Sequence, residues 1–215
     1  ASKFGKVVLA GTGGDELFGG YPWRYFRPEK PIVFNDMIDQ YYLKWQRLVN
    51  NSTLKQLIEP IWKDVEHIRT RDIFEQVLRQ TTHRELSEED CFEQSLYLEA
   101  KTFLHGLLVV EDKLSMAHSL ETRVPFLDND LVDFACQLPM SLKVGRNDHT
   151  VNENNIAEKF KHSYQGKKIL RETFKKYLGD SFVKNKKQGF SSPDATWFKG
   201  ESIDYIESEF NHLPP

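Results

Sequence analysis

Lys6-Val-Val-Leu-Ala-Gly-Thr-Gly-Gly-Asp-Glu-Leu-Phe-Gly-Gly-Tyr21 is the stretch around which the rest of the chain is organised. The short apolar run that precedes the glycines predicts a buried strand of a parallel sheet. Gly11, Gly13 and Gly14 then allow turns that residues with a Cβ avoid, and they bring backbone N–H groups close to a ligand. A glycine turn between a strand and a short helix can hold phosphate through its N–H groups and the helix dipole.

Asp15 stands at the start of that short helical turn. A carboxylate there would repel phosphate unless Mg²⁺ lay between the two, so Asp15 is a candidate metal ligand. In a simpler alternative, Asp15 caps the helix and the glycines only make a tight turn. Because glycine motifs of this kind occur often by chance, the loop alone favours the simpler alternative, and the other motifs of the chain decide between the two.

The composition of the 215 residues is that of an ordinary globular protein, with 28% charged and 39% hydrophobic residues and a formal net charge of −3. The chain has no long basic run, so we expect no nucleic-acid partner. No apolar stretch approaches the roughly 20 residues that span a bilayer, and no signal peptide precedes Phe4. We therefore expect a cytoplasmic protein without a membrane partner, in which Cys91 and Cys136 are reduced core residues.

The position of the first strand indicates a piece of a larger domain. The predicted strand begins at Val7, and a lone parallel strand cannot satisfy its own backbone N–H and C=O groups. We expect its neighbours to come from outside the chain, and we expect self-association of the isolated chain through exposed strand edges. Beyond residue 30 we expect helices and no multistranded sheet.

Most of the remaining chain has helical periodicity. Apolar residues between 35 and 78 predict three helices without chemistry of their own, and Ser87 predicts the start of a helix that runs to about His105. The aromatic segment Tyr21–Arg27 either lines a pocket or forms a packed lid, and base rates favour packing. Asp128 predicts the cap of the next helix. We expect a mobile loop over residues 145–166, an amphipathic helix over 167–178 that stops at a glycine, and short helices near 194–198 and 202–210.

Two further stretches contain unusual charges. Residues 111–128 read Glu-Asp-Lys-Leu-Ser-Met-Ala-His-Ser-Leu-Glu-Thr-Arg-Val-Pro-Phe-Leu-Asp. Charged groups among apolar residues are usually paired or bind something, so Lys113, Glu121 and Arg123 form either a buried ion network or part of a site for substrate and phosphate. The second stretch, Lys184-Asn-Lys-Lys-Gln-Gly-Phe-Ser-Ser-Pro193, is either a solvated basic turn or a loop that closes over phosphates.

Three motifs together resemble the synthetase domain of glutamine-dependent asparagine synthetases and their relatives. They are Gly11-Thr-Gly-Gly-Asp-Glu-Leu-Phe-Gly-Gly-Tyr21, Asp112-Lys-Leu-Ser-Met-Ala-His-Ser-Leu-Glu-Thr-Arg-Val-Pro-Phe-Leu-Asp128 and Lys186-Lys-Gln-Gly-Phe-Ser191, which occur in the family's order. The resemblance implies that residues 1–215 are the C-terminal part of an α/β domain of the adenine-nucleotide α-hydrolase (ATP pyrophosphatase) type. It implies a mostly α-helical chain with one N-terminal parallel strand.

The resemblance also implies an ATP-dependent, amide-forming ligase. In this family ATP activates a substrate carboxylate, that of aspartate or a relative, as an acyl-adenylate, and Mg²⁺-bound pyrophosphate leaves. Ammonia that a separate glutaminase domain releases from glutamine then attacks. By resemblance Asp15 matches a Mg²⁺ ligand and Lys187 matches the lysine that stabilises the adenylation transition state. The implied nucleotide- and pyrophosphate-binding residues are Gly11, Thr12, Gly13, Gly14, Lys113 and Arg123.

The chain also departs from the family's pattern. The family's pyrophosphate loop, Ser-Gly-Gly-x-Asp-Ser, and the N-terminal cysteine of the glutaminase domain do not occur in the 215 residues, so we expect the isolated chain to be inactive. Thr12 stands where asparagine synthetases carry a glutamate, and a threonine cannot act there as a general base, so the acceptor substrate is left open. A second hypothesis is a non-catalytic binding or scaffold module that retains the fold. The presence of both Asp15 and Lys187 favours the ligase.

Overall fold

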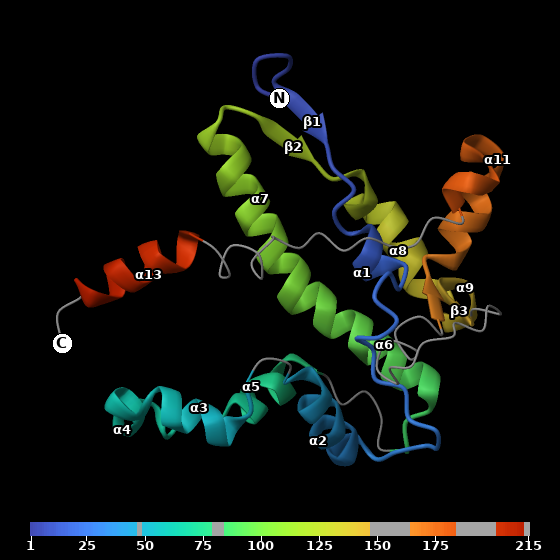
Figure 1. The fold of residues 1–215 in the computed structure, drawn as a ribbon. Coiled ribbons are helices and arrows are strands. Elements are labelled where there is room, and N and C mark those ends of the chain that lie inside the picture. The colour runs from blue at the N-terminus through green and yellow to red at the C-terminus, as the bar shows by residue number, and fades with distance from the viewer. Residues whose placement is uncertain (47–48, 79–83, 147–163, 184–200, 213–215) are drawn as a thin grey trace. The chain divides into compact units, whose positions relative to one another are not determined.

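The structure is a computed structural model that describes residues 1–46, 49–78, 84–146, 164–183 and 201–212, which are mostly helical (Figure 1). The chain divides into two compact units, Ala1–Phe174 and Lys175–Pro215. Each unit is described here by itself. The glycine loop and the residues described around it, up to Arg171, belong to the first unit.

The glycine loop follows a parallel strand, as predicted. Strand β1 (Val7–Leu9) pairs in parallel with β2 (Glu121–Arg123), with Val7 opposite Glu121 and Leu9 opposite Arg123. The expectation that its neighbour comes from outside the chain is therefore wrong for this edge. The predicted burial is also wrong, because Val7 and Leu9 are 51% and 71% exposed. Within the described residues this sheet has only two strands, and no second layer covers these two side chains.

After β1 the backbone turns at Gly13 and enters the short helix α1 (Gly14–Leu17). Gly13 has a left-handed φ of 92°, and an added Cβ would overlap Leu127 Cδ2 and lie 2.8 Å from Leu127 Cγ. Both the backbone conformation and the close packing require glycine here. Asp15 lies inside α1, whose N-cap is Gly13 without a side-chain hydrogen bond, so the capping alternative for Asp15 is wrong.

A helical part follows and contains the largest core cluster. Phe26, Met37, Ile38 and Tyr41 are buried together, and the rings of Phe26 and Tyr41 stack with centroids 5.6 Å apart. This confirms the packed-lid interpretation of the aromatic segment. Helices are present over this range as predicted, and Asn50 caps α3, since its side chain accepts a hydrogen bond from the Thr53 N–H. The elements are α2 (Phe34–Trp45), α3 (Asn51–Leu57), η1 (Glu59–Ile61), α4 (Trp62–Val65) and α5 (Thr70–Val77).

The next three helical segments follow one another without a break. They are α6 (Glu88–Glu99), the π-helical η2 (Ala100–Leu104) and α7 (His105–Ala117). The start is confirmed, because Ser87 Oγ accepts a hydrogen bond from the Asp90 N–H at 3.2 Å and Asp90 Oδ2 accepts one from the Ser87 N–H at 2.8 Å. The predicted end near His105 is wrong. The π turn accommodates an additional residue without ending the helix, and no proline stands between residues 100 and 117.

Among the described residues beyond α7 there are three strands, where helices and a loop were expected. Besides β2, strands β3 (Val144–Arg146) and β4 (Tyr164–Gly166) pair in antiparallel fashion, so both ends of the predicted mobile loop are structured. Residues 147–163 lie outside the described residues. Three-residue strands are held by backbone pairing and carry too few side chains for a period-two pattern, which is why periodicity missed them. Between β2 and β3 lie η3 (Pro125–Leu127), α8 (Asn129–Gln137) and α9 (Met140–Lys143), and Asp128 caps α8 as predicted.

Two more helices complete the described chain. The predicted break at Gly179 is confirmed, because this residue has a left-handed φ of 79° and non-helical torsion angles inside α11 (Lys168–Val183). The predicted helix near 202–210 corresponds to α13 (Glu201–Asn211). The helix predicted near 194–198 and the basic turn over 184–193 lie outside the described residues. No helix among the described residues is long and apolar enough to cross a bilayer.

The two cysteines differ in burial, which gives a direct chemical test of this fold. Cys91 is 0% exposed and burial raises the pKa of its thiol to about 12, whereas Cys136 is exposed, contrary to its predicted core position. Because the thiolate is the reactive form, about 1 in 10⁴ of the Cys91 thiols is ionised at pH 8. We expect an aromatic disulfide reagent at pH 8 to titrate one thiol per chain rapidly and the second only after denaturation. Cys136→Ser removes the rapid phase, and two rapid thiols in the unmodified chain would contradict this packing.

Candidate functional site

The candidate site is built around Asp15 on α1. Asp15 Oδ1 lies 2.9 Å from Lys167 Nζ, and both side chains are mostly buried. The backbone C=O of Asp15 accepts a hydrogen bond from the Gly20 N–H at 2.7 Å. The backbone of Asp15 thus joins α1 to the second glycine turn, Gly19-Gly20, while its carboxylate contacts Lys167.

Lys167 comes from the end of β4, which packs against the second glycine turn. The Lys167 N–H donates to the Phe18 C=O at 3.0 Å, and Lys167 has a left-handed φ of 56°. An added Cβ at Gly166 would overlap the Gly19 carbonyl oxygen, so only glycine permits this close approach. Sequence reasoning treated Lys167 as the first residue of an amphipathic helix. The preceding Gly166 was the one local signal that Lys167 has an unusual backbone conformation.

Arg171 adds a second positive charge near Asp15. It lies on α11, and its Nε donates to the Gly166 C=O at 3.2 Å. Burial lowers the pKa of Arg171, and the negative charge of Asp15 acts in the opposite direction. A carboxylate with two cations beside it can bind a metal ion while the cations bind phosphate oxygens. Sequence reasoning missed Arg171 as well, because its contacts depend on how β4 and α11 pack against the loop.

Thr12, in the glycine loop, is joined to α7. Thr12 Oγ1 donates a hydrogen bond to Glu111 Oε2 at 2.7 Å, between residues that are 99 positions apart. Glu111 belongs to the charged stretch over residues 111–128, but no role was predicted for it. A residue of the glycine loop therefore contacts a carboxylate on α7.

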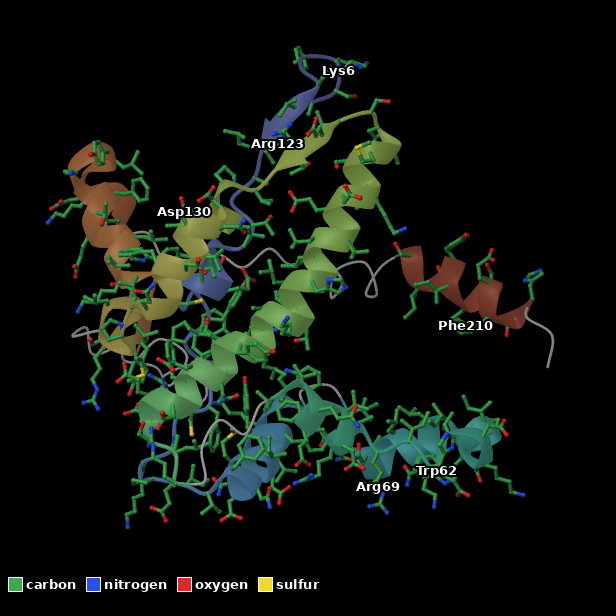
Figure 2. All side chains as sticks on the ribbon, turned by 180° about the vertical axis from the view of Figure 1, so that it is seen from behind. Lys6, Trp62, Arg69, Arg123, Asp130 and Phe210 are labelled. Carbon is green, nitrogen blue, oxygen red and sulfur yellow. The ribbon has the colours of Figure 1, made fainter. Side chains whose placement is uncertain are left out.

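Lys113 and Arg123 do not form the buried ion network that the sequence allowed. Lys113 is exposed on α7. Arg123 Nε donates to Glu121 Oε1 at 2.7 Å, and both side chains are more than half exposed. Figure 2 labels Arg123 on β2, beside β1, and the Arg123 C=O accepts the Ala10 N–H at 2.8 Å just before the glycine loop. The backbone of Arg123 thus positions the loop, while a role of its side chain in phosphate binding stays a prediction.

A buried cluster of charged and aromatic side chains anchors the end of the loop to the π-helical segment. Arg24 Nε lies 3.1 Å from Glu99 Oε1, and Glu99 is 1% exposed at the end of α6. The Arg24 guanidinium also lies 4.2 Å from the ring centroid of Phe103 and 4.9 Å from that of Tyr21. Burial, together with the negative charges of Asp15 and Glu16, raises the pKa of Tyr21 well above its usual value. This cluster holds α1 against the continuous helical run of α6, η2 and α7. Helical periodicity alone did not predict it.

The site offers one carboxylate to a Mg²⁺ ion that substrate phosphates would also bind. Asp15 supplies one partly buried carboxylate oxygen, and Mg²⁺ is commonly held by one or two carboxylates together with substrate phosphates and waters. Among the described residues no group of three or more His, Cys, Asp or Glu side chains could hold a metal ion by itself. Lys187, predicted to act on the phosphates, lies outside the described residues.

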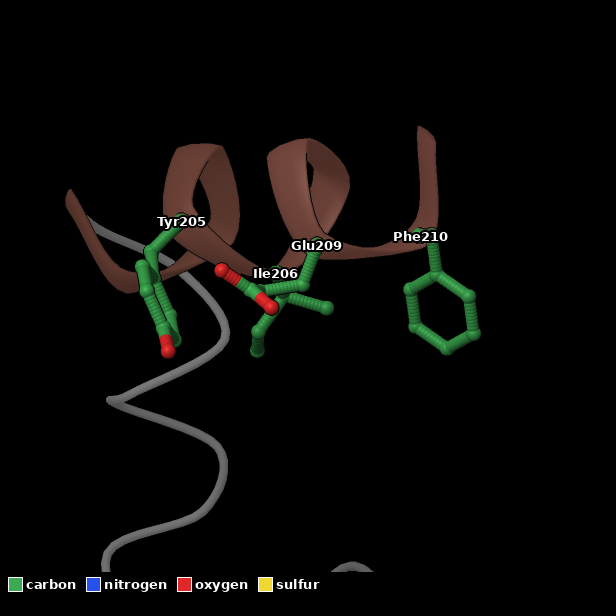
Figure 3. Close-up of a pocket in the computed structure, with 4 residues that line it drawn as sticks. All are labelled: Tyr205, Ile206, Glu209 and Phe210. Carbon is green, nitrogen blue, oxygen red and sulfur yellow. The ribbon is translucent and has the colours of Figure 1, made fainter. Parts of the chain in front are cut away.

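One pocket in the second unit offers no comparable chemistry. Its lining side chains all come from the single helix α13 (Figure 3), so groups from different elements do not converge there. The lining residues are Tyr205, Ile206, Glu209 and Phe210.

Comparisons with known proteins cover nearly the whole chain. A family model described as asparagine synthase matches residues 1–214. "Asparagine synthetase [glutamine-hydrolyzing] 3" of Bacillus subtilis is 27% identical over 94% of this chain, and "Asparagine synthetase [glutamine-hydrolyzing] 1" of the same organism is 26% identical over 97%. The "Amidase chry2" of Gibberella zeae is 32% identical over 47% of the chain. The chain spans 30% and 34% of the length of the two Bacillus proteins. No solved structure matches it.

Proposed function

Because the chain belongs to the asparagine synthase family, we propose that it is the C-terminal part of the synthetase domain of an ATP-dependent, amide-forming ligase. We propose further that residues 1–215 belong to one α/β domain of the adenine-nucleotide α-hydrolase type. The parallel strand β1 that leads directly into the glycine loop supports this fold. The activity of the complete protein is part of the proposal, since the chain spans 30% of a relative's length.

The observation that carries the proposal is the position of Asp15 beside Lys167 and Arg171. In the proposed site Asp15 binds Mg²⁺, and the backbone N–H groups of residues 11–14 approach the phosphates of ATP. Lys167 and Arg171 bind phosphate oxygens by charge-assisted hydrogen bonds. Mg²⁺ would supply charge neutralisation on the departing pyrophosphate. Lys187 would stabilise the negative charge that develops on it during adenylation.

The proposed reaction has two stages. The carboxylate of aspartate or a related substrate attacks the α-phosphorus of ATP, and pyrophosphate leaves. Ammonia, released from glutamine by a glutaminase domain elsewhere in the complete protein, then displaces AMP and forms the amide. We propose amino-acid biosynthesis in the cytoplasm as the setting of this reaction. Self-association of the isolated chain stays a prediction, for which the exposed Val7 and Leu9 on β1 are favourable.

The test of this function is ATP–pyrophosphate exchange, which reports adenylation without the ammonia step. We expect the complete protein to catalyse exchange that depends on an amino-acid carboxylate and on Mg²⁺. We expect the isolated 215-residue chain to show no exchange. Without the pyrophosphate loop it has only about half of the phosphate site, which cannot position ATP for the reaction. Exchange by the isolated chain would contradict its inactivity. A complete protein without carboxylate-dependent exchange would favour the scaffold hypothesis.

A further inference from the structure

The second stage of the proposed reaction needs a proton acceptor. When ammonia attacks the acyl carbon, its lone pair forms the C–N bond and the nitrogen becomes positively charged. The nitrogen must then lose a proton, while the C–O bond to AMP breaks and AMP leaves with the electron pair. A positioned carboxylate can accept this proton, and such general-base catalysis typically contributes a factor of about 10² to 10⁴.

The glycine loop offers a hydroxyl at Thr12, and a threonine hydroxyl does not ionise near neutral pH, so Thr12 itself is no base. The structure brings a carboxylate to this hydroxyl, since Glu111 Oε2 accepts the hydrogen bond of Thr12 Oγ1 at 2.7 Å. A carboxylate that accepts this hydrogen bond through one oxygen keeps lone pairs available for a proton.

The π-helical segment explains how α7 presents Glu111 to the loop. An α-helix turns by about 100° per residue, so one additional residue in a π turn rotates every later side chain by about that angle. Segment η2 ends at Leu104, immediately before α7, and Phe103 within it packs on Arg24. The buried Arg24–Glu99 pair therefore holds the turn that sets the face on which Glu111 lies.

We infer that Glu111 is the proton acceptor of the amide-forming step and that Thr12 is its positioning residue. The inference rests on the proposed function and goes beyond it by assigning the second stage to a residue of α7. Glu111 is partly buried, whereas its neighbour Asp112 is exposed. Of the two carboxylates on α1, Asp15 is paired with Lys167 and Glu16 is only 3% exposed.

The experiment uses the complete protein and measures two rates, ATP–pyrophosphate exchange and ammonia-dependent amide formation. Glu111→Gln keeps the size of the side chain and an oxygen that can accept from Thr12, but it removes the base. We expect amide formation to fall on the order of 10²-fold while exchange changes by less than about 2-fold. Glu111→Asp should recover part of the loss, since it restores a carboxylate. Thr12→Val, which removes only the hydrogen bond, should give a smaller loss in amide formation.

Asp112→Asn is the matched control and should leave both rates unchanged. Equal losses of exchange and of amide formation in Glu111→Gln would indicate a structural role and overturn the inference, as would normal amide formation in that variant. If the unmodified protein shows no exchange, the proposed function fails, and this inference fails with it. Normal exchange in the unmodified protein, followed by either of the first two results, would overturn the inference alone.

Discussion

Replacing Lys187 by alanine in the complete protein is expected to lower ATP–pyrophosphate exchange on the order of 10²-fold or more. The sequence predicts a glycine-containing turn around this lysine, from which it would approach the phosphates as charge develops on the leaving group. Removing one such donor from an oxyanion site typically costs a factor of about 10² to 10³ in kcat. Because the contact is made mainly in the transition state, kcat and kcat/KM should fall together while KM changes little.

Lys186→Ala provides the matched control within the same predicted turn. Lys184 and Lys186 are expected to be solvated, and the loss of an exposed lysine should change the exchange rate little. Equal and small losses for Lys186→Ala and Lys187→Ala would mean that the basic turn is only surface. The assignment of Lys187 to the adenylation step would then be wrong.

Replacing Gly20 by alanine should lower the rate of ATP–pyrophosphate exchange about as much as Lys187→Ala does, because it displaces Asp15. An added Cβ at Gly20 would overlap Asp15 Oδ1 and lie 2.5 Å from Asp15 Cγ and 2.7 Å from Asp15 Cα. The last of these is a backbone atom, so the turn itself has to shift. Overpacking of this kind costs about 1–3 kcal/mol in stability. A displacement of the carboxylate by about 1 Å can lower the rate about 10²-fold.

The measurement is exchange as a function of Mg²⁺ concentration, together with thermal unfolding. We expect Gly20→Ala to require more Mg²⁺ and to melt at a lower temperature than the unmodified protein. Gly106→Ala is the control, because nothing lies within 4 Å of an added Cβ at this exposed helical position. Alanine there should stabilise α7 by about 0.5–1 kcal/mol and leave exchange unchanged. Normal Mg²⁺ dependence in Gly20→Ala would mean that Asp15 does not hold the metal ion.

The sequence by itself determined the features that depend on residues close together in the chain. The glycine loop between a strand and a helix, the Ser87 and Asp128 caps and the break at Gly179 all follow from the backbone preferences of a few neighbouring residues. The family membership is equally a property of motifs in the chain. Helices with clear periodicity were predicted, whereas the π turn was not, because periodicity does not report a change of helix type.

Only the tertiary structure decided which distant residues meet. The pairing of β1 with β2, the contact of Lys167 with Asp15 and the hydrogen bond from Thr12 to Glu111 join residues about 100 or more positions apart. Local propensity carries no information on such contacts, since they depend on how whole elements pack. The same reason explains the two wrong burial predictions, for β1 and for Cys136. An apolar residue is buried only where another element covers it, and that covering element is chosen by the packing of the whole chain.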